Sequence, residues 1–279
     1  MTATDPGPVV QRILLGAELR DARESAGLST ADATKALGWY AGKLSKIEQG
    51  DAKVTDKDLA KAVKVYGIVD DRAGRLQQLA TDSRRRLPPA RVPEWAVKYV
   101  NLMAAAREVK MFNIDCFPGT VQTPEYAHAM LSEAVMFSPA ELERMSEERA
   151  SRTDRFTAAD NPPRLWLVLD EAALHRQVGG AKVLLRQLEK VRDLARLPNV
   201  TVQVIPFDGG AHASHGVAFS IVNLFEGKPG IVYVESLTGS DYLGREHTRA
   251  YNLAYDKLRV AALSERRTIE LIDRRIAEL

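Results

Sequence analysis

Polar and ionisable residues that could carry acid–base chemistry gather in the C-terminal part of the chain, beside segments whose composition predicts β-strands. The candidate ligand-binding or active-site residues are Glu171, Arg176, His212, His215, Glu235 and Tyr242. A histidine paired with a carboxylate can act as a general base, and His212 has two candidate partners, Glu171 and Glu235. Open α/β sheets bind ligands at the carboxyl ends of their strands, so these residues define a candidate site.

The spacing of these residues does not complete an enzyme or metal site. Catalysis needs a nucleophile, a base and an orienting group placed together, and the sequence shows no such set, so no catalytic residue is predicted. His212 and His215 have no third ligand at a zinc-binding spacing, so no metal is predicted. The turn at 208–210 lacks the lysine and the further glycine of a phosphate-binding loop, and no cofactor is predicted. A small-molecule pocket, or a surface that dimerises or binds a partner protein, stays open.

A second set of residues, near the N-terminus, has the types and spacing of a DNA-contacting surface. Two short amphipathic segments flank Gly38, where glycine permits the tight turn of a helix-turn-helix. The second helix of that motif lies in the major groove of double-stranded DNA, and a helix N-terminus with hydroxyl groups can bind a phosphate. The predicted DNA-facing residues are Ser29, Thr30, Tyr40, Ala41, Gly42, Lys43, Ser45 and Lys46.

Two further features of this segment bear on its function. Arg23 and Glu48 are spaced so that they could meet between the first and third helices, where a bidentate ion pair would fix the orientation of the recognition helix. Ala41 and Gly42 occupy recognition positions without a side chain that makes a bidentate base contact, and Gly42 weakens the helix by roughly 1 kcal/mol. The sequence therefore leaves two roles open for this segment: it could recognise a particular DNA sequence, or it could serve as a docking module for a protein.

The elements that position the N-terminal residues follow from hydrophobic periodicity. Apolar residues at helical spacing predict helices over 12–26, 30–37, 40–49, 56–66 and 71–81. The inward positions are Leu15, Leu19, Ala22, Ala33, Ala36, Leu37, Leu44, Ile47, Leu59, Val63, Leu76 and Leu79. Prolines near residue 90 stop helices. We therefore expect a DNA-binding domain over 1–81, a linker over 82–93 and a second domain over 94–279.

The second domain alternates helical and strand-like stretches. Helices are expected over 95–106, from Pro124 with Thr123 as N-cap, and over 138–157, 180–196 and 242–278; strands are expected over 109–117, 165–169, 200–206, 217–224 and 230–235. The strand–helix–strand order around 180–196 predicts a parallel pair, and the turn at 226–229 predicts a hairpin. The expected fold class is α+β: an all-α helix-turn-helix bundle, then an α/β domain with a mixed sheet of about five strands covered by helices.

Composition sets bounds on partners and compartment. The 279 residues are 45% hydrophobic with a net charge of +2, which suits two globular domains. Residues 1–90 hold 15 Lys and Arg against 12 Asp and Glu, so DNA contact requires a local basic patch. The single cysteine, Cys116, excludes an internal disulfide and is expected to be an apolar filler. No signal-peptide pattern or long apolar run is present, so we expect a cytoplasmic protein without a membrane partner.

The N-terminal motifs resemble the xenobiotic-response-element (XRE, Cro/repressor-like) helix-turn-helix family. The matching stretches are Leu19-Arg20, Ala26-Gly27-Leu28-Ser29, Ala33, Leu37-Gly38 and Ser45-Lys46-Ile47-Glu48-Gln49-Gly50. A glutamine commonly follows the serine at Ser29 in that family, whereas this chain has Thr30. The resemblance implies a DNA-binding regulator whose dimers bind two half-sites about 34 Å apart.

The C-terminal part resembles the second domain of the actinomycete WhiJ-like regulators. The matching stretches are 118–127, 164–174, 178–180, 197–207, 210–212 and 232–239. The resemblance implies a transcriptional regulator, often encoded beside a small partner protein, and no settled ligand or reaction for this domain.

The sequence thus predicts a homodimeric DNA-binding transcriptional regulator with a C-terminal domain that senses a small-molecule effector or binds a partner. Two alternatives belong to other classes. One is a biosynthetic enzyme that keeps a vestigial helix-turn-helix and has its active site in the C-terminal domain; we expect a non-enzyme more than an enzyme. The other is an antitoxin-like module that pairs with a small partner protein.

Overall fold

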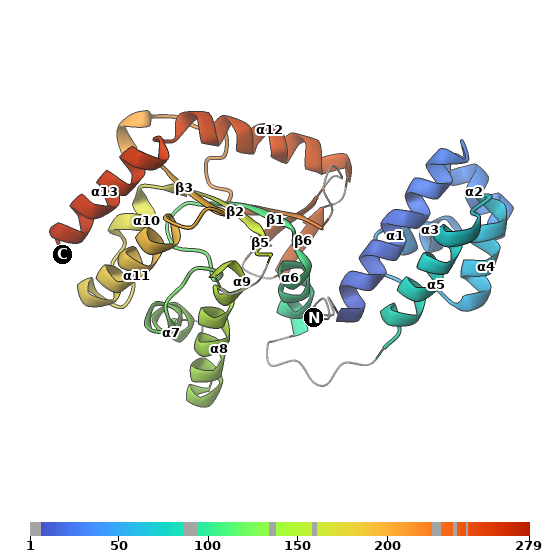
Figure 1. Ribbon diagram of the computed structural model, residues 1–279, viewed down its shortest axis with the longest axis horizontal. Helices are drawn as coiled ribbons and strands as arrows, with labels where there is room; N and C mark the ends of the chain where they lie inside the picture. The colour runs from blue at the N-terminus through green and yellow to red at the C-terminus, as the bar shows by residue number, and fades with distance from the viewer. Residues whose placement is uncertain are drawn as a thin grey trace. The chain divides into compact units, whose positions relative to one another are not determined.

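The computed structural model describes residues 7–85, 94–133, 138–157, 161–224, 230–236, 239–243 and 245–279. The chain divides into two compact units, residues 1–105 and 106–279 (Figure 1). The expected linker over 82–93 lies largely outside the described residues. The division by contacts falls later, after Ala105, so the helix that we assigned to the second domain belongs to the first unit.

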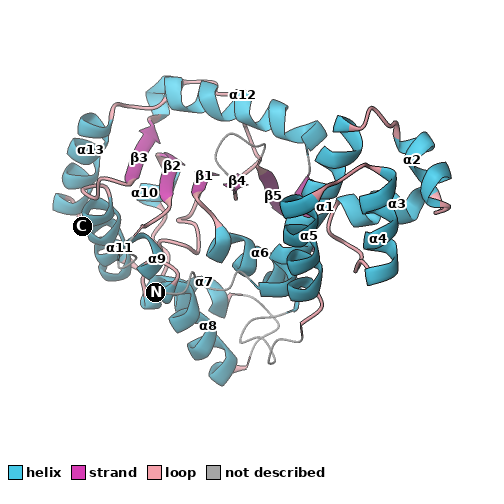
Figure 2. Cartoon of the chain, turned by 45° about the vertical axis from the view of Figure 1, so that its right-hand side comes forward, coloured by secondary structure: helices cyan, strands magenta, loops and turns pink. Residues whose placement is uncertain are grey.

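The first unit is helical in all of its described elements (Figure 2). Its helices are α1 (Gly7–Ser25), α2 (Thr30–Leu37), α3 (Ala41–Glu48), α4 (Asp56–Val65), α5 (Asp70–Ser83) and α6 (Glu94–Ala105). The five helices predicted over 12–81 are all present, and α1 begins five residues earlier than its apolar pattern indicated. Helix α1 packs against α3, α5 and α6.

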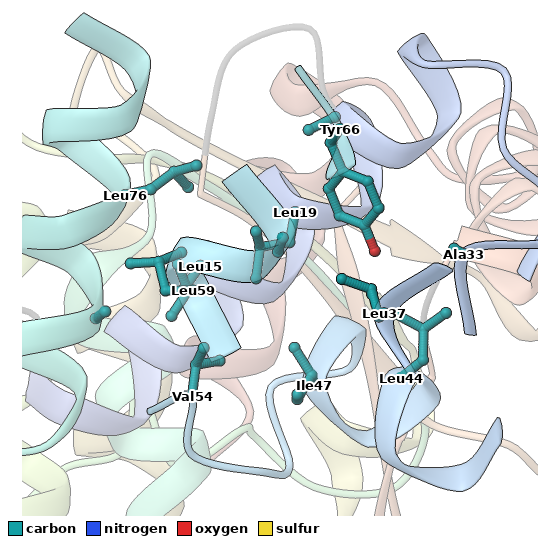
Figure 3. Packing of buried hydrophobic residues seen from close by; sticks show 13 residues of the cluster. Leu15, Leu19, Ala33, Leu37, Leu44, Ile47, Val54, Leu59, Tyr66 and Leu76 are labelled. Carbon is teal, nitrogen blue, oxygen red and sulfur yellow. The ribbon is translucent and has the colours of Figure 1, made fainter. Parts of the chain in front are cut away.

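A single apolar cluster holds the first five helices together (Figure 3). Its fully buried members include Leu15 and Leu19 from α1, Leu37 from α2 and Leu44 from α3. The prediction that Ala36 faces inward is wrong, because Ala36 is exposed. Ala33 and Leu37 define the buried stripe of this short helix, and position 36 lies about 100° away from Leu37 around the axis.

Two turns set the geometry of the helix-turn-helix. Ser29 is the N-cap of α2, and its hydroxyl oxygen accepts the Asp32 N–H at 3.1 Å. Gly38 ends α2 with a φ of 60°, a left-handed conformation that glycine adopts without strain. The chain then turns directly into α3, as the sequence predicts.

The second unit contains a six-stranded mixed sheet. Its strands are β1 (Glu108–Asn113), β2 (Arg164–Asp170), β3 (Val200–Ile205), β4 (Phe219–Asn223), β5 (Ile231–Ser236) and β6 (Gly239–Leu243), in the order β3-β2-β1-β4-β5-β6. The first three strands are parallel, and β4, β5 and β6 are antiparallel. This confirms the expected fold class, the parallel pair and the neighbouring hairpin strands; the predicted turn at 226–229 lies outside the described residues.

Several predicted elements differ from the structure. The strand expected over 109–117 ends at Asn113, and the helical stretch expected from residue 242 begins at Arg245. Strand β6 is an addition to the expected five: its first three residues include Gly239 and Asp241, types that are depleted in strands. The helix expected over 138–157 is divided into α8 (Pro139–Ser151) and α9 (Asp154–Thr157). Between them, the Thr153 hydroxyl donates to the Thr120 carbonyl at 2.9 Å, which fixes the bend.

Helices cover both faces of the sheet. On one face lies α12 (Arg245–Ala261), and on the other lie α7 (Pro124–Ser132), α8, α9 and α11 (Ala181–Leu194) (Figure 1). Beside β3 packs α13 (Glu265–Ala277), and α10 (Ala172–His175) follows β2. Because side chains alternate between the faces of a strand, Phe112, Val168 and Ile221 pack under α12.

Candidate functional site

The outward face of the helix-turn-helix carries most of the predicted DNA-facing residues. Ser29, Thr30, Gly42, Ser45 and Lys46 are exposed, and the Tyr40 side chain is 68% exposed. On the opposite side of α3, Leu44 and Ile47 are buried in the core. Ala41 is the first residue of α3, and its side chain lies outside the description. The helical period therefore presents a polar surface with one aromatic ring on it.

The Tyr40 ring lies against Gly42. A Cβ atom at position 42 would lie 3.3 Å from Tyr40 Cε2, which is tighter than ordinary van der Waals contact, and 3.5 Å from Cδ2. Tyr40 is also the N-cap residue of α3, without a side-chain cap. The absence of a side chain at Gly42 thus gives the Tyr40 ring its place on the recognition helix. This contact gives a structural reason for a residue that is otherwise unfavourable in a helix.

Lys43 has a structural partner that the sequence prediction missed. Its ammonium lies 2.7 Å from Asp58 Oδ1 and 4.8 Å from the centre of the Trp39 ring. Burial raises the pKa of Asp58, but the hydrogen bonds from Lys43 and Thr55 outweigh it, so the pKa lies below its usual value. Lys43 therefore ties α3 to the start of α4, and its ammonium is held on a carboxylate rather than presented freely to DNA.

The hydroxyl of Ser29 is likewise engaged within the protein. It donates to Asp32 Oδ2 at 2.5 Å while its oxygen accepts the Asp32 N–H. The Asp32 carboxylate therefore occupies the positive N-terminus of α2, where it would compete with a phosphate. Thr30, the first residue of α2, is exposed, and so is Lys46, the one exposed lysine of α3.

Arg23 and Glu48 meet between α1 and α3, as their spacing predicts. Arg23 donates from Nε to Glu48 Oε1 at 2.6 Å and from Nη2 to Oε2 at 3.0 Å. Its Nη1 donates to the Leu28 carbonyl at 2.9 Å. Both charged side chains are less than a tenth exposed, and the hydrogen bond to Glu48 raises the pKa of Arg23. The pair fixes α3 on α1 in one orientation.

In the second unit, the candidate site centres on the connection from β3 to β4. Because β2 and β1 lie between these strands, residues 206–218 must cross the carboxyl ends of β2 and β1. His212 is the anchor of this crossing loop: its side chain is 4% exposed and lies 3.6 Å from Asp170 Oδ2 at the end of β2. Its ring also meets the Phe112 ring edge-to-face at 5.4 Å between centres.

Both nitrogens of the His212 ring are engaged. Nδ1 accepts the Ser214 N–H at 3.3 Å, and Nε2 lies toward Asp170. His215 stacks on His212 at 4.1 Å between ring centres, and its Nε2 accepts the His212 N–H at 3.0 Å. Burial lowers the pKa of His212, His215 lowers it further, and Asp170 opposes both. Each of the two imidazoles thus accepts a backbone N–H group of the crossing loop and helps to fold it.

The other predicted site residues do not join His212. Glu171 accepts the Phe207 N–H at 2.7 Å and lies 3.3 Å from His175 Nε2, so it supports the crossing loop from the side. Arg176 lies 3.6 Å from Asp115, with both side chains exposed. The proposed His212 pairs with Glu171 or Glu235 are therefore wrong.

The remaining two predicted residues lie farther along the sheet. Glu235 on β5 accepts the Tyr233 hydroxyl at 3.1 Å, and the Tyr242 ring on β6 packs beside Tyr233. Three strand spacings, roughly 14 Å, separate β2 from β5. The carboxylate that pairs with His212 is Asp170, and the sequence did not predict this pair. The position of Asp170 at the end of a strand could be predicted, but the path of the crossing loop determines which carboxylate His212 meets.

A second polar feature of this unit lies inside it. Gln187 of α11 is fully buried; its Oε1 accepts the Thr123 N–H at 2.8 Å and its Nε2 donates to the Val121 carbonyl at 2.9 Å. Lys190 donates to the Gln122 carbonyl at 2.8 Å. These side chains satisfy the backbone of the buried loop after β1. A polar residue on the apolar stripe of α11 was the available signal.

Several features bear on other chemistry. Burial, with a contribution from Asp115, raises the pKa of Cys116 to about 11, so at neutral pH the thiol is protonated and poorly nucleophilic. Among the described residues, no three His, Cys, Asp or Glu side chains are grouped closely enough to hold a metal ion. No helix in the described ranges is long and apolar enough to span a membrane.

The fold and the exposed α3 surface define a helix-turn-helix protein with a separate α/β unit. In agreement, residues 14–76 match the family described as a helix-turn-helix domain. Residues 97–274 match the family described as a domain of unknown function (DUF5753), and because they make up more than half of the chain, the protein belongs to that family. Neither the comparison with curated proteins nor that with solved structures gives a match.

Proposed function

We propose that the protein is a DNA-binding transcriptional regulator of the XRE type, with a WhiJ-like C-terminal domain of actinomycete origin, and that it acts as a cytoplasmic dimer. The observation that carries the proposal is the exposed face of α3, with Tyr40, Ser45 and Lys46 outward, on a helix whose orientation is fixed by the buried Arg23–Glu48 pair. Such a helix can enter the major groove.

Each side chain on this face has a defined part in the proposal. The Tyr40 ring offers an apolar surface of the kind that contacts a thymine methyl group. Lys46 supplies charge for a phosphate or a guanine edge, and Thr30 supplies a hydroxyl at the start of α2. Lys43 contributes by holding α3 on α4 through Asp58. Ser29 caps α2 and has a smaller part than the sequence suggested.

We propose that the second unit, residues 106–279, is the regulatory or dimerising part of the molecule and that it receives a small-molecule effector or a partner protein. The engaged nitrogens of His212 do not favour the enzyme alternative, since a general base needs a nitrogen that can take a proton from a substrate. The alternative of an antitoxin-like module that binds a small partner protein is compatible with the same surface. The two functions can be distinguished by binding measurements, because a regulator binds its own upstream DNA, whereas the module would bind its partner without DNA.

The proposal is tested by fluorescence anisotropy of the intact protein on its own upstream DNA and on scrambled DNA across a salt series. We expect selective binding that weakens steeply with salt. Tyr40→Ala should reduce the preference for the upstream DNA, and Lys46→Ala should weaken binding to both DNAs and flatten the salt slope. Lys64→Ala, an exposed lysine near the end of α4, is the matched control. Equal, weak binding to both DNAs would rule the proposal out.

A further inference from the structure

Helix α12 has two apolar faces, and the sheet uses only one of them. Toward the sheet, Tyr255 and Leu258 are fully buried. On the side away from the sheet, Leu253 is 56% exposed and Val260 is 87% exposed. Among the described elements of the second unit, no other helix covers this side of α12 (Figure 1). Two large apolar side chains of α12 thus face outward.

The outward residues are spaced as in a helix that pairs with another helix. Leu253 and Val260 are seven residues apart, so they lie about 20° from each other around the axis and form one seam. Asp256 and Lys257 lie about 60° and 40° from Leu253, on opposite sides of that seam. Both are exposed, and within the described residues neither belongs to an ion pair. The face therefore has an apolar centre with Asp256 on one side of it and Lys257 on the other, and Arg249 lies on the same side as Asp256.

We propose that this face of α12 binds the same face of a second copy of the chain, with the two helices parallel. A two-fold axis along the helices places Leu253 against Leu253 of the second copy, and Val260 against Val260 of the second copy. The same axis brings the Asp256 side of each helix to the Lys257 side of the other, so Asp256 meets Lys257 of the second copy twice. Arg249 then faces the small Ala250 of the second copy.

The size of the seam sets the strength of the pairing. A single helix pair buries less than the roughly 1,600 Å² of a standard interface, so the dimer should dissociate on dilution. The pairing itself needs no DNA. Its use, which is to bring two helix-turn-helix units to two half-sites, rests on the proposed function.

The first test is sedimentation velocity of the full chain over a wide concentration range. The wild type should pass from monomer to dimer. Asp256→Lys or Lys257→Asp should each raise the dissociation constant at least about tenfold, because each places like charges together. The exchange variant, Asp256→Lys with Lys257→Asp, should restore the wild-type dimer. Glu147→Lys, the same acid-to-base change on the exposed side of α8, should have no effect.

The outcomes separate the alternatives. A monomeric wild type, or dimers that ignore both single reversals, would overturn the proposal and leave α12 to another protein or to the first unit. Sensitivity to Asp256→Lys alone would also overturn it, because an antiparallel pair would place Asp256 near Arg249 instead. All substituted side chains are exposed, and circular dichroism checks that each variant is folded.

A second measurement does not depend on charge. With the helices parallel, Val260→Cys places two thiols side by side, so mild oxidation should give a disulfide-linked dimer; the native Cys116 thiol has a raised pKa and should not. Absence of the Val260→Cys cross-link would count against the parallel pair. A wild type that dimerises through α12 but does not select its upstream DNA would remove the proposed function and leave the pairing intact.

Discussion

The buried pair of Arg23 and Glu48 shows what a single contact does in this protein. An ion pair in a low-dielectric interior gains little net stability over apolar residues of similar size, but breaking it strands a charge. Here it joins the two helices whose relative orientation decides how α3 meets DNA. We infer that its main effect is on orientation rather than on stability.

This interpretation predicts a difference between single and double variants. Arg23→Ala should lower the free energy of unfolding by about 3–5 kcal/mol, because it leaves Glu48 charged and buried. Arg23→Met combined with Glu48→Leu should recover most of that loss, yet bind DNA less selectively than the wild type. Denaturant unfolding and anisotropy measure the two effects. A double variant that is as unstable as the single one would contradict the argument.

Tyr66 lowers the stability of the first unit because its hydroxyl group is buried. Its hydroxyl is buried and has no hydrogen-bond partner among the described residues, and burial, with the charge of Glu48, raises its pKa to about 12. Tyr66→Phe should therefore stabilise the first unit by about 1 kcal/mol. Tyr255→Phe is the control: that hydroxyl donates to the Trp166 carbonyl at 2.6 Å, so its loss should destabilise the protein by a similar amount. Thermal unfolding of both variants is the measurement.

At the scale of elements, the recognition helix depends on a missing side chain. Gly42→Ala favours the helix by roughly 1 kcal/mol but introduces a Cβ into the space of the Tyr40 ring. We expect a protein of equal or greater stability that discriminates less between its own upstream DNA and scrambled DNA. Gly74→Ala in α5, where a Cβ meets nothing within 4 Å, is the control for helix propensity. Unchanged discrimination by Gly42→Ala would show that the ring position is unimportant.

The crossing loop after β3 should respond to acid. His212 has a pKa below 6.5 in the folded protein, so the unfolded chain binds a proton there first as the pH falls. Stability is therefore complete above about pH 6.5 and declines below it, until the folded pKa is reached. Proton NMR of the 5 histidines gives the values directly. His215→Ala should raise the pKa of His212, and a His212 value above 6.5 would contradict the prediction.

Much at this scale could be predicted from the sequence. Helices α2 to α5 have apolar residues at helical spacing, and α2 and α4 also have capping side chains at Ser29 and Thr55, so the ends of all four were predicted within one or two residues. The bend at Thr153 and the partners of Lys43 and His212 could not be found, because each depends on a residue distant in sequence: Thr120, Asp58 and Asp170. The sequence showed that charged and polar groups are present near these positions, but only the folded chain shows which of them are in contact.

For the whole molecule, the domain boundary is where sequence and contacts differ most. The prolines suggested that residue 94 opens the second domain, and the family match begins nearby, at residue 97. The contacts instead place α6 with the first unit, where it packs on α1 and where Lys98 lies 3.1 Å from Asp51. A helix that follows a proline-rich stretch can return to the domain before it, and local composition does not show this.

The placement of α6 can be tested with fragments. A fragment covering 1–105 should unfold at a higher temperature than one covering 1–85, because α6 adds contacts to α1 and the Lys98–Asp51 pair. A fragment covering 106–279 should fold without α6. Circular dichroism on heating gives all three transitions. Equal melting of the two N-terminal fragments would assign α6 to the second unit instead.

The position of β1 in the middle of the sheet affects how the protein is made. It is the first strand to leave the ribosome, yet Glu108 pairs with Asn223, 115 residues later. The N-terminal unit, with its short-range helical contacts, can fold well before that point. During the interval, one hydrogen-bonding edge of β1 has no strand beside it, and an open edge of this kind invites pairing with other chains. Expression of this protein should therefore be more sensitive to the speed of translation through residues 114–219 than to changes elsewhere.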